Sequence, residues 1–275
     1  MRRWQPQKLA WMFALALVFG IQAHVSAQTL IWNLPAEGSW VRFQGTFEQT
    51  EARPGAAGGD LDLPPWSEQV TIKALGSEMA EVAGEQKPCR WIEIRIERGK
   101  EVDGKLDTGL AGLEIYKVLV PETAIPQGIT NQEGIPLSFL PVVKGYRKVG
   151  SGEITPIVSP ALQLYPLGVL AGYYRTMTVG NAPEDLSTPA GRQSATKYEG
   201  KLEVERAGSR TQEDSTIWRS AEIPFGVAGW TANVVRQVKD ERAPRDDFKT
   251  VSTVKSSVRL SGTGTDATSD LPDSN

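Results

Sequence analysis

Apolar and polar residues alternate with a period of two along several segments of the chain. In residues 90–98, Ile92, Ile94 and Ile96 share one face, and the opposite face carries a tryptophan and charged residues. Other segments also read as strands: residues 40–48, 113–120, 198–204, 230–238 and 248–260. Period-two alternation is typical of strands with one buried and one wet face. We therefore predict an antiparallel sheet.

Helical patterns are scarce along the chain. Residues 137–148 could form a helix after Pro136, although Pro141 would interrupt it beyond its first turn. Residues 53–65 are rich in proline and glycine and are expected to form a loop. An α/β fold needs long amphipathic helices between its strands, and the sequence shows none. We predict a mainly β fold, a single curved antiparallel sheet (half-barrel-like) with few short helices.

Both ends of the chain differ from this strand-rich body. The start has the three parts of an export signal: a basic Arg2-Arg3, an apolar run over residues 9–21 and a small-residue cleavage site at residues 25–27. The apolar run is shorter than the ~20 residues that cross a bilayer. We predict a signal peptide over residues 1–27, cleaved after Ala27, and export to the periplasm or beyond, without a stable membrane span. Residues 28–260 then form the β domain, and residues 261–275 a disordered acidic tail.

Composition removes several classes of function. The signal carries three basic residues, so 27 basic and 33 acidic residues remain, a net charge of −6. An acidic chain without a basic cluster is a poor nucleic-acid binder. The only histidine, His24, lies in the signal, which excludes histidine-dependent triads and metal sites from the mature protein. Cys89 is the only cysteine; we expect it to be buried, with an intermolecular disulfide as the alternative. No cofactor is indicated.

Carboxylates are the remaining candidates for acid–base chemistry. Glu93 with Glu97, and Glu114, are examples of acids that could act in pairs, as in glycosidases. Alternation places Glu93 and Glu97 with Arg95 on the solvent face of one strand, where cross-strand charge pairs are the simpler interpretation. No phosphate-binding loop and no nucleophile elbow occurs. The sequence therefore predicts no catalytic residue.

The most distinctive string covers residues 215–230. It reads as a strand with Trp218, a turn at Pro224-Phe225-Gly226, and a second strand with Trp230. Proline fixes φ and glycine accepts positive φ, which together suit a sharp change of direction. Because such turns usually lie at the surface, we expect Phe225 to be partly exposed at the rim or wall of a cavity. Trp218, Phe225 and Trp230 are thus the candidate ligand-binding residues, with a purely structural hairpin as the alternative.

This string resembles one in uncharacterised secreted bacterial proteins of the periplasmic lipoprotein-carrier (LolA-like) superfamily. Residues 196–200 and 117–122 look like further matching elements. The resemblance implies a strongly curved antiparallel sheet, a half-barrel, that holds an apolar cavity beside short helices. It also implies a lipid or a lipoprotein as a candidate partner.

These observations give one expected function and two alternatives. We expect an exported, non-catalytic module that binds an apolar ligand or a lipidated or extended partner. The first alternative is a carboxylate-based envelope hydrolase that acts on glycan. The second is a structural component of cell-envelope assembly that offers a sheet edge to its partner. The sequence carries no signal for an oligomeric state.

Overall fold

The computed structural model describes residues 31–52, 60–110, 112–124, 140–162 and 178–272. Strands dominate these residues, and two 3₁₀ turns are described, η2 (Pro224–Gly226) and η3 (Arg245–Asp247). The strands are β1 (Trp40–Glu51), β2 (Leu61–Val82), β3 (Glu85–Val102), β4 (Lys105–Asp107), β5 (Leu113–Pro121), β6 (Leu140–Pro141), β7 (Lys144–Val149), β8 (Thr155–Pro156), β9 (Ala161–Leu162), β10 (Thr178–Val179), β11 (Glu184–Thr188), β12 (Gly191–Glu205), β13 (Ser209–Arg219), β14 (Val227–Val238) and β15 (Lys249–Gly264).

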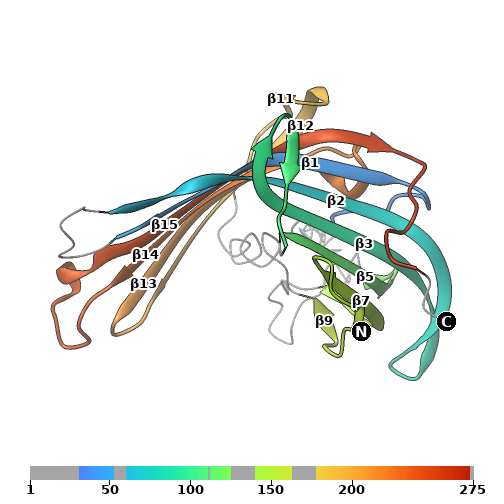
Figure 1. Ribbon diagram of the computed structural model, residues 1–275, viewed down its shortest axis with the longest axis horizontal. Helices are drawn as coiled ribbons and strands as arrows, with labels where there is room; N and C mark the ends of the chain where they lie inside the picture. Colours follow the sequence, from blue (N-terminus) through green and yellow to red (C-terminus); the bar gives the residue numbers. More distant parts are fainter. Residues whose placement is uncertain (1–30, 53–59, 111, 125–139, 163–177, 273–275) are drawn as a thin grey trace, which may run out of the picture.

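Thirteen of these strands form one large antiparallel sheet. Its path runs β10-β12-β13-β14-β15-β1-β2-β3-β5-β7-β8, with β11 paired to β12 and β4 paired to β3. β6 and β9 form a separate pair. The long strands twist from an arm of β13, β14 and β15 into a curved region of β2, β3 and β5 (Figure 1). The predicted fold class, mainly β with a single curved antiparallel sheet, is confirmed.

The sheet consists of two meanders that meet at its centre. One begins with β1 and continues through β2, β3 and β5 to β8; the other runs from β12 to β15. β15 pairs with β1 from Trp40↔Gly264 to Glu51↔Ser252, so the last strand is the neighbour of the first. Every other pair along the path joins strands that are close in sequence.

The two faces of the sheet differ in character. On the inner face, Ile92, Ile94 and Ile96 of β3 pack with Val70 and Ile72 of β2 in a continuous buried core. The alternate positions of the same strands carry polar side chains and form the outer face. This is the division that period-two alternation predicts. Inner and outer face keep these meanings below.

Two local predictions are wrong. Residues 61–65, expected in a loop, belong to β2, and Pro64 and Pro65 lie where its register with β1 shifts between Phe47 and Gln49. Proline lacks the N–H that a regular ladder needs, so an irregular position accommodates it. Residues 140–148, considered for a helix, contain β6 and most of β7 instead. The register pairs Lys144 to Val149 with β5, and this pairing overrides the weak helical pattern.

The tail prediction is wrong for residues 261–272. Residues 261–264 complete β15, and residues 265–272, called the C-terminal strap below, lie over the outer face near β2 and β3. The strap is anchored by Leu271, whose side chain is 2% exposed, and by ion pairs from Asp270 to Lys73 and Arg95. Polar composition predicts disorder because it counts few apolar residues, but it cannot register contacts that specific partners offer.

Some sequence predictions fall outside the described residues. The signal peptide with its cleavage site after Ala27 is one of them, so export stays a prediction. Among the residues that the structure describes, no helix is long and apolar enough to cross a membrane.

Candidate functional site

Phe225 is a core residue and not a rim residue. Its side chain is 0% exposed, which contradicts the predicted partial exposure. The turn itself is as predicted, with φ of 65° at Phe225 and 82° at Gly226. The backbone N–H of Trp32 donates to the Phe225 carbonyl at 2.8 Å, so the segment around Trp32 covers the turn. Sequence reasoning treated the turn as a surface feature because it could not see this covering segment.

The two predicted tryptophans lie on opposite faces. Trp230 is 0% exposed in the inner core, with its ring edge-on to Phe43 at 5.1 Å between centroids. Trp218 is on the outer face, where the Arg259 guanidinium lies 4.3 Å from its ring centre and its Nε1 donates to Glu184 Oε1 at 2.6 Å. All three predicted residues, Trp218, Phe225 and Trp230, are buried and belong to the core cluster, so none lies at an exposed rim, and their role in ligand binding stays a prediction.

A groove lies elsewhere, across four neighbouring strands of the arm. Its floor is a strip of small residues in register: Gly200 on β12, Ser215 on β13, Ala232 on β14 and Ser256 on β15. The groove has a volume of about 780 Å³ and extends to Thr178 of β10, the last strand on this side of the sheet.

Two rows of larger polar side chains flank this strip. One row holds Glu199, Thr216 and Thr231, and the other holds Lys201, Asp214, Asn233 and Lys255. The strip residues are buried whereas the flanking residues are exposed or half-buried, so the groove opens on the flanking residues' face. Ile217 and Trp230 lie two positions from the strip residues Ser215 and Ala232 and point into the core, so the strip side chains face inward as well. The flanking residues alternate with the strip and face the other way, so the groove opens on the outer face.

Most of the residues that line the groove are polar, and their charges balance. Glu199 and Asp214 are balanced by Lys201 and Lys255, and a 3.3 Å ion pair joins Lys201 to Asp214. Asn233 Oδ1 is buried and has no hydrogen-bond partner in the described structure. A buried acceptor of this kind is costly unless a donor reaches it. Asn233, which lines the groove, thus carries an acceptor that no described donor satisfies.

Sequence reasoning missed the groove residues. Alternation alone shows that Thr216 and Thr231 face the same way as their polar neighbours. It does not give the register that aligns Ser215 with Ala232 and Ala232 with Ser256. Four small residues spaced along 57 positions become one strip only after the strands have paired.

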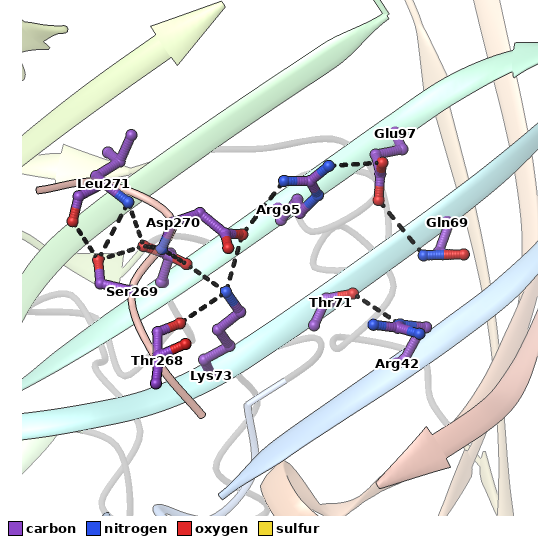
Figure 2. A network of polar contacts seen from close by, with 11 residues as sticks. Arg42, Gln69, Thr71, Lys73, Arg95, Glu97, Thr268, Ser269, Asp270 and Leu271 are labelled. Atoms are coloured by element: carbon purple, nitrogen blue, oxygen red, sulfur yellow. Dashed lines mark hydrogen bonds and ion pairs between the residues drawn. The ribbon is translucent and has the colours of Figure 1, made fainter. Parts of the chain in front are cut away.

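A second polar region on the outer face surrounds Glu93. This side chain, expected on a solvent face, is 0% exposed because the C-terminal strap covers it. Lys73 Nζ lies 2.8 Å from Glu93 Oε1, the cross-strand pair that alternation predicts. Glu97 is paired with Arg95 at 2.8 Å on the same face (Figure 2). Glu93 and Glu97 therefore serve as partners of basic groups.

A third polar group closes one end of the inner core. Glu68, which is 0% exposed, accepts from Arg98 Nε at 2.8 Å, and Arg98 also approaches Glu114 at 3.4 Å. Glu114 binds Arg147 at 2.9 Å and accepts a hydrogen bond from the Tyr116 hydroxyl. Burial raises the pKa of Glu68, which Arg98 only partly offsets. Burial also acts to raise the pKa of Glu114, but the hydrogen bonds from Tyr116 and Arg147 outweigh it and lower that pKa.

Tyr116 should titrate late and limit stability in alkali. Burial, with the adjacent Glu114 carboxylate, raises the pKa of Tyr116 from 10.0 to about 12. The unfolded chain therefore loses this proton first as the pH rises past 10, and the folded state loses stability until about pH 12. Ultraviolet absorbance titration should show a late tyrosinate phase from Tyr116. Tyr116→Phe should remove that phase and lessen the loss of stability, and a late phase that persists in this variant would contradict the prediction.

The structure gives no support to a reactive thiol at Cys89 or, within the described residues, to a metal site. Cys89 is 0% exposed, as expected, and burial raises the pKa of its thiol, which disfavours the reactive thiolate. Across the described ranges, no three histidine, cysteine or acidic residues are grouped so that they could hold a metal ion.

Comparisons with known proteins identify no family. No protein-family model matches the chain, and no curated protein does. Among solved structures, it is similar to a candidate exported protein with a YmcC-like fold from Bacteroides fragilis NCTC 9343. The identity is 9%, the coverage is 86% of this chain and 100% of that chain, and the TM-score is 0.27. A TM-score this low does not establish a shared fold, so the lipoprotein-carrier resemblance stays a prediction.

Proposed function

We propose that the chain is a non-catalytic module that binds an extended polypeptide partner in the outer-face groove across β12 to β15. The observation that carries this proposal is Asn233 Oδ1, a buried acceptor without a partner that lines the groove. A backbone N–H of a bound peptide is the kind of donor that this oxygen lacks. Export of the module is part of the proposal.

The groove's shape supports an extended partner. It crosses four strands and ends at Thr178 on the edge of the sheet, so an extended chain can enter from that side. Its balanced charges favour recognition by hydrogen bonds and shape over attraction of a highly charged ligand.

Peptide selection on the full-length chain tests the proposal. Peptides enriched from a random library should bind the wild-type chain, as measured by fluorescence polarisation. Thr216→Trp fills the groove and should abolish this binding. Thr211→Trp lies on the same strand and is also half-buried, but it does not line the groove and should leave binding unchanged. Equal binding by both variants, or no enrichment on the wild type, would overturn the proposal.

A second pair of variants isolates the unpartnered acceptor. Asn233→Leu removes Oδ1 and should weaken binding of the selected peptides by roughly tenfold, the effect of one lost hydrogen bond. Asn33→Leu is the matched control, because Asn33 Oδ1 is also buried without a partner in the described structure but lies outside the groove. Unchanged affinity in Asn233→Leu would remove the observation on which the proposal depends.

A further inference from the structure

The C-terminal strap occupies a built binding slot on the outer face. Glu93 accepts hydrogen bonds from Ser269 Oγ at 2.7 Å, from the Asp270 N–H at 3.0 Å and from the Leu271 N–H at 3.4 Å (Figure 2). Lys73 Nζ donates to the Thr268 carbonyl at 2.9 Å. Every one of these contacts is made by a side chain of β2 or β3. The slot is therefore complete without the strand that carries the strap.

Charge makes the slot selective for an acidic side chain. Asp270 Oδ2 lies 2.8 Å from Lys73 Nζ and 3.3 Å from Arg95 Nη1, between the two cations. Burial acts to raise the pKa of Asp270, but these two cations outweigh it and hold the pKa below its usual value. Leu271, next in the chain, is 2% exposed. The slot thus recognises Ser269 to Leu271 through hydrogen bonds to Ser269 Oγ and to two backbone N–H groups, and through the charge of Asp270.

The strap is joined to the sheet by a short connection with few bonds. Between Gly264, the last residue of β15, and Thr268, two hydrogen bonds hold it: Trp40 Nε1 donates to Asp266 Oδ1, and the Ala267 N–H donates to the Gly38 carbonyl, both at 2.8 Å. The slot, in contrast, supplies most of the strap's hydrogen bonds and ion pairs. If the strap left, Glu93 would lose three donors, and water would take their place beside the remaining ion pair with Lys73.

We propose that the slot formed by Lys73, Glu93 and Arg95 is an interaction surface for the Ser269-Asp270-Leu271 segment of a second copy of this chain, so that two molecules can exchange straps. The exchanged contacts are the same as those within one molecule, which makes such swapping a low-cost route to a dimer. This surface is separate from the groove, and the proposal does not depend on the proposed function.

Geometry restricts how two copies can exchange straps. Four residues separate Gly264 from Ser269, and the five steps between the two Cα atoms span at most roughly 17 Å when extended. The ends of β15 in the two molecules must therefore lie close together. Since each molecule gives a strap and receives one, the arrangement closes on itself as a two-fold pair.

A charge-reversal experiment tests the exchange. Asp270→Arg puts a positive side chain of the strap beside the positive Lys73 and Arg95 of the slot. Arg95→Glu puts a negative side chain of the slot beside the negative Asp270 of the strap. Within either variant alone the pair is mismatched. In a mixture, the introduced arginine in the strap of one variant can meet the introduced glutamate in the slot of the other, and the wild-type partners Asp270 and Arg95 meet in the second slot. Native mass spectrometry of the mixture should show a one-to-one dimer that neither variant forms alone.

The double variant Asp270→Arg with Arg95→Glu is the matched control. It carries the same two changes in one chain, restores an opposite-charge pair within the molecule, and should show the same oligomeric state as the wild type. Circular dichroism spectra identical to that of the wild type establish that each variant is folded. A mixture of folded single variants that forms no dimer would overturn the proposal.

A measurement on the wild-type chain does not depend on the variants. Isotopically heavy and light wild-type proteins, mixed at high concentration, should form heavy–light dimers through exchanged straps. Addition of a peptide that covers residues 265–275 should dissociate these dimers, and the same peptide with Asp270→Lys should not. Dimers that both peptides leave intact, or no mixed dimers at all, would contradict strap exchange.

Discussion

Replacing Phe225 by alanine is expected to lower the free energy of unfolding by about 3–5 kcal/mol, the usual cost of truncating a buried phenylalanine. The side chain is 0% exposed within the inner core. Removal of its ring leaves a cavity between elements held in place by several backbone hydrogen bonds, so the site has little freedom to collapse. Chemical denaturation followed by circular dichroism measures the loss.

Phe47→Ala is the control for this substitution. Phe47 is half-buried and stacks on Trp66 at 5.6 Å between ring centroids, outside the core cluster. Its truncation should cost about 1 kcal/mol, the scale of one aromatic pair. If Phe225→Ala cost no more than Phe47→Ala, the assignment of Phe225 to the core would be contradicted.

Replacing Lys73 by methionine should destabilise the fold by about 3 kcal/mol, because it leaves the buried carboxylate of Glu93 without its cationic partner. The two atoms lie 2.8 Å apart, and the side chains are 12% and 0% exposed. Lys73 also holds Thr268 and Asp270 of the strap, so these contacts are lost too. Urea denaturation measures the change, and Lys73→Arg, which keeps the charge, should restore most of the stability.

Lys87→Met is the matched surface substitution. Lys87 pairs with Glu85 at 3.1 Å, but the two side chains are 34% and 73% exposed. Exposed pairs contribute at most about 1 kcal/mol, so this variant should differ little from the wild type. Equal losses in both lysine variants would show that burial of Glu93 has no energetic consequence.

Much of the sheet was predictable because its signal is local. Ile92, Ile94 and Ile96 alternate with charged residues, and β3 follows this pattern with the isoleucines in the core. Strands were also predicted over much of β1, β5, β12, β14 and β15. The prediction failed at Pro64 and Pro65 because an irregular register accepts residues that a regular ladder excludes. Register depends on partners that are distant in sequence, and no local pattern contains it.

The candidate sites were much less predictable for the same reason. Phe225 was expected at the surface because its turn has the composition of a surface turn, but the segment around Trp32 covers it. Glu93 was placed correctly on the polar face of β3, and only the strap, 176 positions away at Ser269, makes it a buried acceptor. The groove depends on the alignment of four strands. In each case the local element was predicted correctly and the missing information lay in long-range contacts.

The pairing of β15 with β1 also affects how the chain reaches this structure. During synthesis, β1 emerges more than two hundred residues before its partner, since Trp40 pairs with Gly264. Until then one side of β1 is an exposed row of unpaired backbone groups, the kind of edge that promotes aggregation. The meander that begins with β1 can form early from local hairpins, but joining the two meanders is a high-contact-order step, which is intrinsically slow. The nascent protein should therefore be most vulnerable to misassembly, and most dependent on chaperones, in the interval before β15 arrives.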